Sequence, residues 1–231
     1  MTPPDTETAR ADLLAGLAGE IPRDPSRFTL VGVDGVDGSG KSTFAQGLAE
    51  ELAGLGASVA VIHMDDFHNV RAARYRLGRE SPEGFWLDSY DYEALHREVL
   101  DPLGPDGHGR YRPASSDLKS DSPARVDPQQ AHPGSIVIVE GMFLHRDELA
   151  VRWDYSLFLD VPFSETARRM AARDGSPADP EHPAMARYVQ GQRLYFQACK
   201  PWSRATRIID NSDWGNPRVT SQVATSSTTE R

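Results

Sequence analysis

Eight consecutive residues have the types and spacing that bind nucleotide phosphates. Residues 35–42, GVDGSGKS, match the P-loop pattern G-x-x-x-x-G-K-[S/T]. Glycines let successive backbone N–H groups turn towards phosphate oxygens, and the following helix start adds a partial positive charge. Lys41 can then reach the β- and γ-phosphates, and the Ser42 hydroxyl can ligate magnesium. Asp34, directly before the loop, is expected to bond loop N–H groups. We expect the loop to bind ATP and Mg²⁺ through Gly35, Asp37, Gly38, Ser39, Gly40, Lys41, Ser42 and Thr43.

Carboxylates follow two apolar runs further along the chain. Asp65 and Asp66 come directly after the run 58–64, and Glu140 follows the run 136–139. Phosphoryl transfer needs a group that orients or deprotonates the acceptor hydroxyl, and we assign that role to Asp65. Asp66 could serve instead if the strand boundary shifts by one residue, and Asp65 could also cap a loop or hold magnesium through water. Burying a carboxylate without a partner is costly, so Glu140 is expected to reach magnesium or its coordinated water.

Histidines and arginines complete the candidate site. We expect His68 and His145 to contact the acceptor, because they follow the two carboxylate positions closely. Arg169 and Arg173 are four apart on a predicted helix, so they share a face and could bind nucleotide phosphates. Arg168 is expected to point elsewhere.

Alternating strand and helix patterns must position these residues. β-branched apolar runs alternate with runs of helical spacing, which predicts a three-layer α/β fold with a five-stranded parallel sheet flanked by helices. Because the carboxyl ends of parallel strands meet at one edge, the motifs should converge there. The expected strands are 28–34, 58–64, 136–139, 155–160 and 206–210, and the expected helices are 6–19, one after Ser42, one from 88 or 89 to 100, 164–173 and 184–199.

The polar and proline-rich segments divide the rest of the chain. We expect a single P-loop domain over residues 1–216, with a lid at about 174–183 and an acceptor-site insertion at about 66–133. Residues 104–112 are expected to join the acceptor pocket, and residues 217–231 to form a disordered tail. One group of aromatic residues could either stack on a planar acceptor or pack in the core: Tyr75, Phe85, Trp86, Tyr90 and Tyr92.

Composition narrows the classes of function. The chain has 231 residues, 39% of them hydrophobic, which suffices for one sizeable core. Its net charge of −9 argues against proteins that coat nucleic acid or an anionic membrane. The single cysteine, Cys199, and the lack of a signal-peptide pattern favour a cytoplasmic protein.

Four motifs in order resemble the uridine kinase and phosphoribulokinase-like family of P-loop kinases. They are the P-loop, residues 64–68 (MDDFH), residues 139–141 (VEG) and residues 169–174. The resemblance implies that Asp65 acts as base towards the acceptor hydroxyl and that Glu140 helps with magnesium. It also implies ATP as donor, and pairing or tetramer formation, as in related kinases. The chain departs from true uridine–cytidine kinases at His68, where they carry Tyr, and at 115–121, which has neither an aromatic residue nor a histidine.

The resemblance therefore implies transfer of the γ-phosphate of ATP, with magnesium, to a hydroxyl of a small metabolite. Uridine or cytidine is the first expected acceptor, and nicotinamide riboside, pantothenate or a sugar-like molecule is the alternative. A nucleotide-binding regulatory ATPase without a small acceptor is a different class. The sequence has neither the Asn-Lys-x-Asp motif of GTPases nor the Leu-Ser-Gly-Gly signature of ABC-type ATPases.

Overall fold

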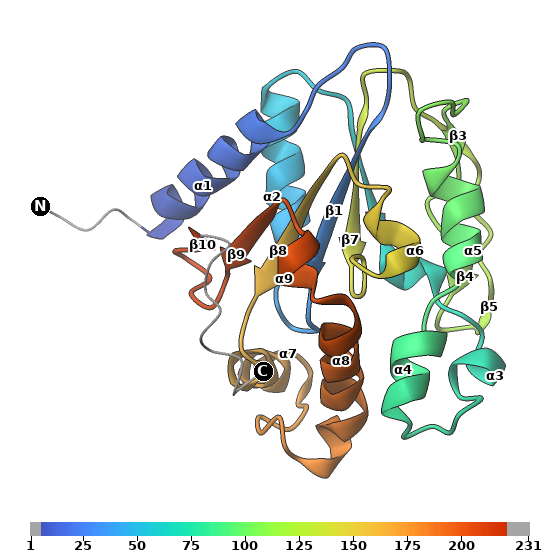
Figure 1. Cartoon of the computed structure of the whole chain (residues 1–231), viewed down its shortest axis with the longest axis vertical. Coiled ribbons are helices and arrows are strands. Elements are labelled where there is room, and N and C mark those ends of the chain that lie inside the picture. The colour runs from blue at the N-terminus through green and yellow to red at the C-terminus, as the bar shows by residue number, and fades with distance from the viewer. Residues whose placement is uncertain (1–5, 221–231) are drawn as a thin grey trace, which may run out of the picture.

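A mostly parallel sheet forms the centre of the computed structural model, which describes residues 6–220 (Figure 1). The strand order is β10-β9-β8-β1-β7-β2, and all neighbours are parallel except β9 and β10. This confirms the predicted α/β fold, with the P-loop strand β1 between β7 and β8. The strands are β1 (Thr29–Gly35), β2 (Val59–His63), β7 (Ile136–Gly141), β8 (Tyr155–Asp160), β9 (Arg207–Asp210) and β10 (Arg218–Thr220).

Helices cover both faces of the sheet. The principal helices are α1 (Thr6–Glu20), α2 (Lys41–Gly54), α4 (Pro82–Asp88), α7 (Phe163–Asp174) and α8 (Ala186–Cys199). Shorter helices are α3 (Arg71–Arg74), α5 (Tyr92–Leu95), α6 (Asp147–Ala150) and α9 (Pro201–Arg204), with 3-10 turns at Met64–Phe67 and Pro183–Met185 and a π-helical turn at His96–Leu100. Two short hairpins lie in the insertion: β3 (Arg110–Tyr111) with β6 (Gln129–Gln130), and β4 (Ser116–Asp117) with β5 (Ser122–Pro123).

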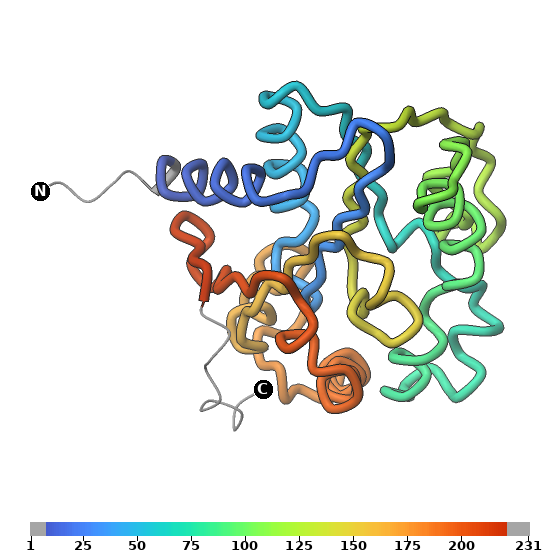
Figure 2. The backbone as a smooth tube through the Cα atoms, turned by 45° about the horizontal axis from the view of Figure 1, so that its top comes forward, coloured from blue at the N-terminus to red at the C-terminus, as the bar shows by residue number. Residues whose placement is uncertain are grey.

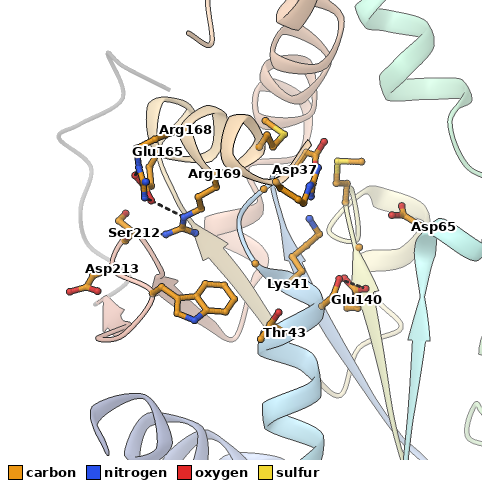
Figure 3. Close-up of a pocket in the computed structure, with 18 residues that line it drawn as sticks. Asp37, Lys41, Thr43, Asp65, Glu140, Glu165, Arg168, Arg169, Ser212 and Asp213 are labelled. Carbon is orange, nitrogen blue, oxygen red and sulfur yellow. Dashed lines mark hydrogen bonds and ion pairs between the residues drawn. The ribbon is translucent and has the colours of Figure 1, made fainter. Parts of the chain in front are cut away.

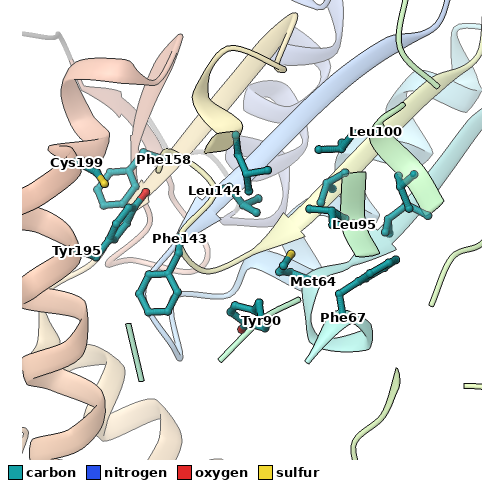
Figure 4. Close-up of a cluster of buried hydrophobic side chains, with 14 of the residues drawn as sticks. Met64, Phe67, Tyr90, Leu95, Leu100, Phe143, Leu144, Phe158, Tyr195 and Cys199 are labelled. Atoms are coloured by element: carbon teal, nitrogen blue, oxygen red, sulfur yellow. The ribbon is translucent and has the colours of Figure 1, made fainter. Parts of the chain in front are cut away.

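Alternating side chains of the strands build two hydrophobic cores. On β7, Ile136 and Ile138 pack in the core shared with α1 and α2, whereas Val137 and Val139 pack in the core on the opposite face. Strand side chains alternate between faces, so a continuous apolar run serves both cores. The core that contains Val137 and Val139 also includes many of the aromatic residues of the insertion and of α8, among them Tyr90 and Tyr195 (Figure 4).

Two boundaries differ from the sequence prediction. Asp88 ends α4, and the following helix begins only at Tyr92, because Asp91 accepts a hydrogen bond from Ala94 N at 2.8 Å and caps it. Residues 218–220 fall in the predicted disordered tail but pair antiparallel with β9 as an edge strand. That part of the tail prediction is wrong, and residues 221–231 lie outside the described part of the chain.

Segments distant in sequence meet at the carboxyl ends of the parallel strands. Figure 1 shows the first turn of α2 at this end of the sheet, together with the whole of helices α4, α7 and α8. Helix α4 packs against α8. Figure 2 shows the insertion, in green, on the side of the sheet away from α1. None of the described helices is long and apolar enough to cross a membrane.

Candidate active site

The P-loop opens onto a cavity of about 760 Å³ at the carboxyl edge of the sheet (Figure 3). Gly40 directly precedes α2 with φ 90°, the left-handed region that glycine adopts without strain. The Lys41 side chain extends into this cavity, and its Nζ donates to the Val36 carbonyl at 2.9 Å. Asp34 Oδ1 accepts from Gly35 N at 2.7 Å, as predicted for the residue before the loop. The loop thus presents an amine and backbone donors to one open space.

Ser42 and Glu140 meet beside the loop. Ser42 Oγ donates to Glu140 Oε1 at 2.9 Å, and His63 Nδ1 lies 2.6 Å from the same oxygen. The hydrogen bond to Glu140 is the main reason that the pKa of His63 is raised. No group of three His, Cys, Asp or Glu side chains within residues 6–220 could hold a metal unaided. A hydroxyl and one carboxylate fit Mg²⁺, which usually keeps several waters and takes further oxygen ligands from substrate phosphates.

Asp65 lies across the cavity from Arg169, as Figure 3 shows. It follows β2 on a 3-10 turn, and its Oδ1 accepts from the Tyr90 hydroxyl at 2.8 Å. Burial and the neighbouring Asp65 raise the pKa of Tyr90, so this hydroxyl remains a donor. Asp66 is not among the residues that line this cavity, and burial raises the pKa of its carboxyl. Of the two acids, Asp65 is the one that faces Lys41 across the cavity.

Three arginines of α7 line the same cavity. Arg169 is anchored by Glu165 at 2.8 Å and by the Asn211 and Ser212 carbonyls at 2.7 and 2.9 Å. Arg173 lies 3.9 Å from Asp37 and is paired with Asp174. Arg168, expected to point elsewhere, also lines the cavity, and that expectation is wrong. None of residues 175–183, all within the described chain, lines it. The arginines of this site therefore come from the helix before the predicted lid, and the remaining cation is Lys41 of the P-loop.

One wall of the cavity was not anticipated from the sequence. Trp214 lies so close to Gly40 that a Cβ added there would be 2.4 Å from its Cζ3 atom. Asn211 Nδ2 donates to the Ser39 carbonyl at 2.8 Å and ties this C-terminal segment to the loop. No motif marks these residues, and only the packing of residues 211–214 against the P-loop reveals them.

A second, smaller cavity of about 260 Å³ adjoins the first. Asp37, Asp65 and Met142 line both cavities, which makes this second space a candidate site for the phosphate acceptor, and we call it the acceptor cavity. His68, predicted to contact the acceptor, is among the residues that line it. Tyr75 and Phe85, from the aromatic group that could stack on an acceptor, also line it, as do Arg74, Ser89 and Leu118 of the predicted acceptor-site insertion. Arg187 and Tyr188 complete the lining and were not predicted as site residues.

Two predicted contributors to the acceptor pocket lie elsewhere. His145 is 1% exposed, its Nδ1 lies 2.7 Å from Asp34 Oδ2, and its Nε2 lies 3.0 Å from Ser156 Oγ. This buried network uses both ring nitrogens, so the prediction that His145 contacts the acceptor is wrong. Within residues 104–112, His108, Arg110, Tyr111 and Arg112 line a separate cavity, and none of the segment lines the acceptor cavity.

Comparisons with known proteins find similar kinases. No family model matches the chain. Nicotinamide riboside kinase 1 of Rattus norvegicus is 30% identical over 152 residues, which cover 65% of this chain and 69% of the relative. A possible uridine kinase from Bacillus stearothermophilus has a similar structure, with a TM-score of 0.67, 24% identity, and coverage of 86% of this chain and 96% of that one.

Phosphoribulokinase from Rhodobacter spheroides shares the fold with a TM-score of 0.54 and 17% identity, over 88% of this chain and 83% of that one. Phosphoryl transfer from a nucleotide is the chemistry that suits the P-loop cavity, the paired Ser42 and Glu140, and the related kinase. The chain therefore belongs to the family of P-loop kinases that includes nicotinamide riboside kinase 1, shares the fold of uridine kinase and phosphoribulokinase, and is an ATP- and magnesium-dependent phosphotransferase with an alcohol group as acceptor.

Proposed function

We propose that this kinase transfers the γ-phosphate of ATP to a metabolite hydroxyl held beside Asp65. The position of Asp65 carries the proposal, because this residue lines both the P-loop cavity and the acceptor cavity. An acceptor in the smaller cavity would then have its hydroxyl between the phosphates and a carboxylate. Such positioning is the main contribution that a protein makes to phosphoryl transfer.

Each residue has a distinct role in this step. Asp65 accepts the proton of the acceptor hydroxyl. The hydroxyl oxygen forms a bond to the γ-phosphorus as the bond between that phosphorus and the leaving ADP oxygen breaks. Lys41 binds the β- and γ-phosphates, and Arg169 and Arg173 add positive charge to the cavity. Ser42 and Glu140 would hold magnesium, which neutralises phosphate charge when bound.

The substitution Asp65→Asn tests the base. It should lower kcat by at least about 100-fold, the usual scale of general acid–base catalysis, and leave the Kd for ATP nearly unchanged. Lys41→Ala should damage both kcat and ATP binding. Near-normal turnover by Asp65→Asn would show that another group accepts the proton.

The identity of the acceptor is open to direct assay. The family resemblance makes uridine and cytidine the first candidate acceptors, and nicotinamide riboside, pantothenate and sugars are the alternatives. ADP release measured with each of them separates the kinase from a regulatory ATPase. Acceptor-dependent release supports the kinase, and equal release without an acceptor supports the ATPase.

We propose a cytoplasmic location, supported by the buried free thiol of Cys199 and the absence of other cysteines. The acidic net charge of −9 supports a small-molecule acceptor rather than nucleic acid or a membrane surface as the partner. Assembly into a homo-oligomer remains a prediction from the family resemblance, and light scattering would test it.

A further inference from the structure

Two arginine side chains line the acceptor cavity although the protein buries them almost completely. Arg74 of α3 is 9% exposed and Arg187 of α8 is 7% exposed. Transfer of a guanidinium group out of water is costly unless an opposite charge or good hydrogen bonds compensate it. The partners of these two groups therefore decide whether they are structural or await a ligand.

Few groups of the protein offset the cost of burying these two guanidinium groups. Arg74 Nη2 lies 3.4 Å from Asp121 Oδ1, a single long contact, and its buried Nε has no hydrogen-bond partner among the described residues. Arg187 Nη1 donates to the neutral carbonyl of Arg79, and no carboxylate of residues 6–220 forms an ion pair with it. By contrast, the equally buried Arg146 makes two hydrogen bonds of 2.8 Å to Glu148.

An aromatic ring holds the two groups in place. The guanidinium carbons of Arg187, Arg74 and Arg79 lie 4.9, 5.4 and 5.6 Å from the centre of the Tyr75 ring. Arg187 also lies 5.5 Å from the centre of the Phe85 ring. Stacking on an aromatic face orients a guanidinium group while leaving its N–H donors free. Positive charge is thus concentrated around Tyr75 in a chain whose net charge is −9.

We propose that the acceptor carries an anionic group, a carboxylate or a phosphate, which Arg74 and Arg187 bind inside the acceptor cavity. Guanidinium groups match both anions because their N–H donors can bond two oxygens at once. The inference rests on the proposed function, since it takes this cavity to be the acceptor site. A hydroxy acid such as pantothenate, or a sugar phosphate, fits better than neutral uridine. The positively charged ring of nicotinamide riboside fits least.

Matched pairs of acceptors test the charge requirement. ADP release would be compared for pantothenate and pantothenol, which differ in a carboxylate, and for ribulose 5-phosphate and ribulose, which differ in a phosphate. Uridine and nicotinamide riboside complete the panel. We expect kcat/KM to be at least about tenfold higher for the anionic member of one pair, and the pair concerned identifies carboxylate or phosphate as the anion.

Substitutions then locate the anion. Arg187→Gln should raise KM for the anionic acceptor by about 10- to 100-fold, the range for loss of a charge-assisted hydrogen bond, while kcat and the KM for ATP change little. Arg187→Lys keeps the charge but loses the paired donors, so it should give an intermediate KM. This intermediate value would show that misfolding is not the cause of the effect of Arg187→Gln. Arg76→Gln is the matched control, because Arg76 is 64% exposed, pairs with Asp88 and lies outside the acceptor cavity.

Binding without turnover separates this inference from the proposed function. Calorimetry with the same pairs, and the P-loop filled by a non-hydrolysable ATP analogue, reports acceptor binding alone. Preferential binding of an anionic member that Arg187→Gln abolishes supports the inference even if no acceptor stimulates ADP release. Equal binding of neutral and anionic members, or no anionic binding, overturns it, and acceptor-dependent release with uridine would then leave the kinase proposal intact.

Discussion

The Ser42 hydroxyl lies 2.9 Å from a carboxylate oxygen of Glu140, although the two residues are 98 positions apart. Strand β7 brings them together, since it pairs with β1 in parallel register and ends at the same edge from which the P-loop emerges. A hydroxyl at the start of α2 and a carboxylate near the end of β7 therefore face one cavity, where we propose that they hold magnesium.

Replacement of this carboxylate should weaken magnesium binding. We expect Glu140→Gln to raise the Mg²⁺ concentration for half-maximal ADP release by about tenfold or more, because an amide oxygen is a weaker ligand than a carboxylate. A magnesium titration at saturating ATP measures this change. Glu50→Gln is a suitable control, since Glu50 accepts a hydrogen bond from Gln46 on the exposed surface of α2 and does not line the cavity. An unchanged magnesium dependence would remove Glu140 from the metal site.

The Tyr90 hydroxyl should position the proposed base. Tyr90→Phe deletes the 2.8 Å hydrogen bond to Asp65, and we expect kcat to fall by about tenfold while the KM for ATP stays constant. Steady-state kinetics with both substrates varied would separate the two constants. Tyr111→Phe deletes a similar bond to Gln129 away from the site and should leave kcat unchanged. Equal effects of the two substitutions would indicate a general loss of stability.

Gly40 should tolerate no side chain. Gly40→Ala combines a φ of 90° with a Cβ only 2.4 Å from the Trp214 ring, so the loop or the tryptophan must move. We expect ATP affinity, measured by calorimetry, to fall by more than about tenfold. Gly56→Ala has a similar φ of 84° but open space around the new Cβ. It should cost only about 1 kcal/mol of stability and leave ATP affinity intact.

Glu165 should make stability depend on pH in the acidic range. Hydrogen bonds from Arg168 and then Arg169 lower the pKa of Glu165 from 4.5 to about 2. A lowered folded-state pKa stabilises the protein fully above the ordinary value, and this contribution disappears as the pH falls from 4.5 towards 2. The difference in unfolding free energy between wild type and Glu165→Gln should therefore shrink between pH 6 and pH 3. A constant difference in urea titrations would contradict this assignment.

Local patterns sufficed to predict the P-loop, the parallel strands and the carboxylates that end them. The glycine loop needs only its own residues and the helix after it, and β7 is recognisable because both of its faces are buried. Because parallel strands share one carboxyl edge, the sequence alone also indicated that Asp65 and Glu140 would lie near Lys41.

Contacts between distant segments decided the features that the sequence prediction had wrong, namely the position of His145 and the structure of residues 218–220. His145 looked free to meet an acceptor, but its partners Asp34 and Ser156 lie 111 and 11 positions away and enclose it. Residues 218–220 have a composition typical of a tail, yet the exposed edge of β9 supplies hydrogen-bond partners that no local pattern encodes.

The amino-acid sequence by itself determined the donor side of this enzyme, because the P-loop is a short continuous motif whose backbone binds phosphate. Only the tertiary structure decided the acceptor side, where α3 and α8 bring Arg74 and Arg187 to one cavity. These residues are separated by more than a hundred positions; Arg74 lies in the predicted acceptor-site insertion and Arg187 on a predicted helix, and no motif marks either one. Their burial beside one cavity, from which we inferred an anionic acceptor, arises only when the helices pack.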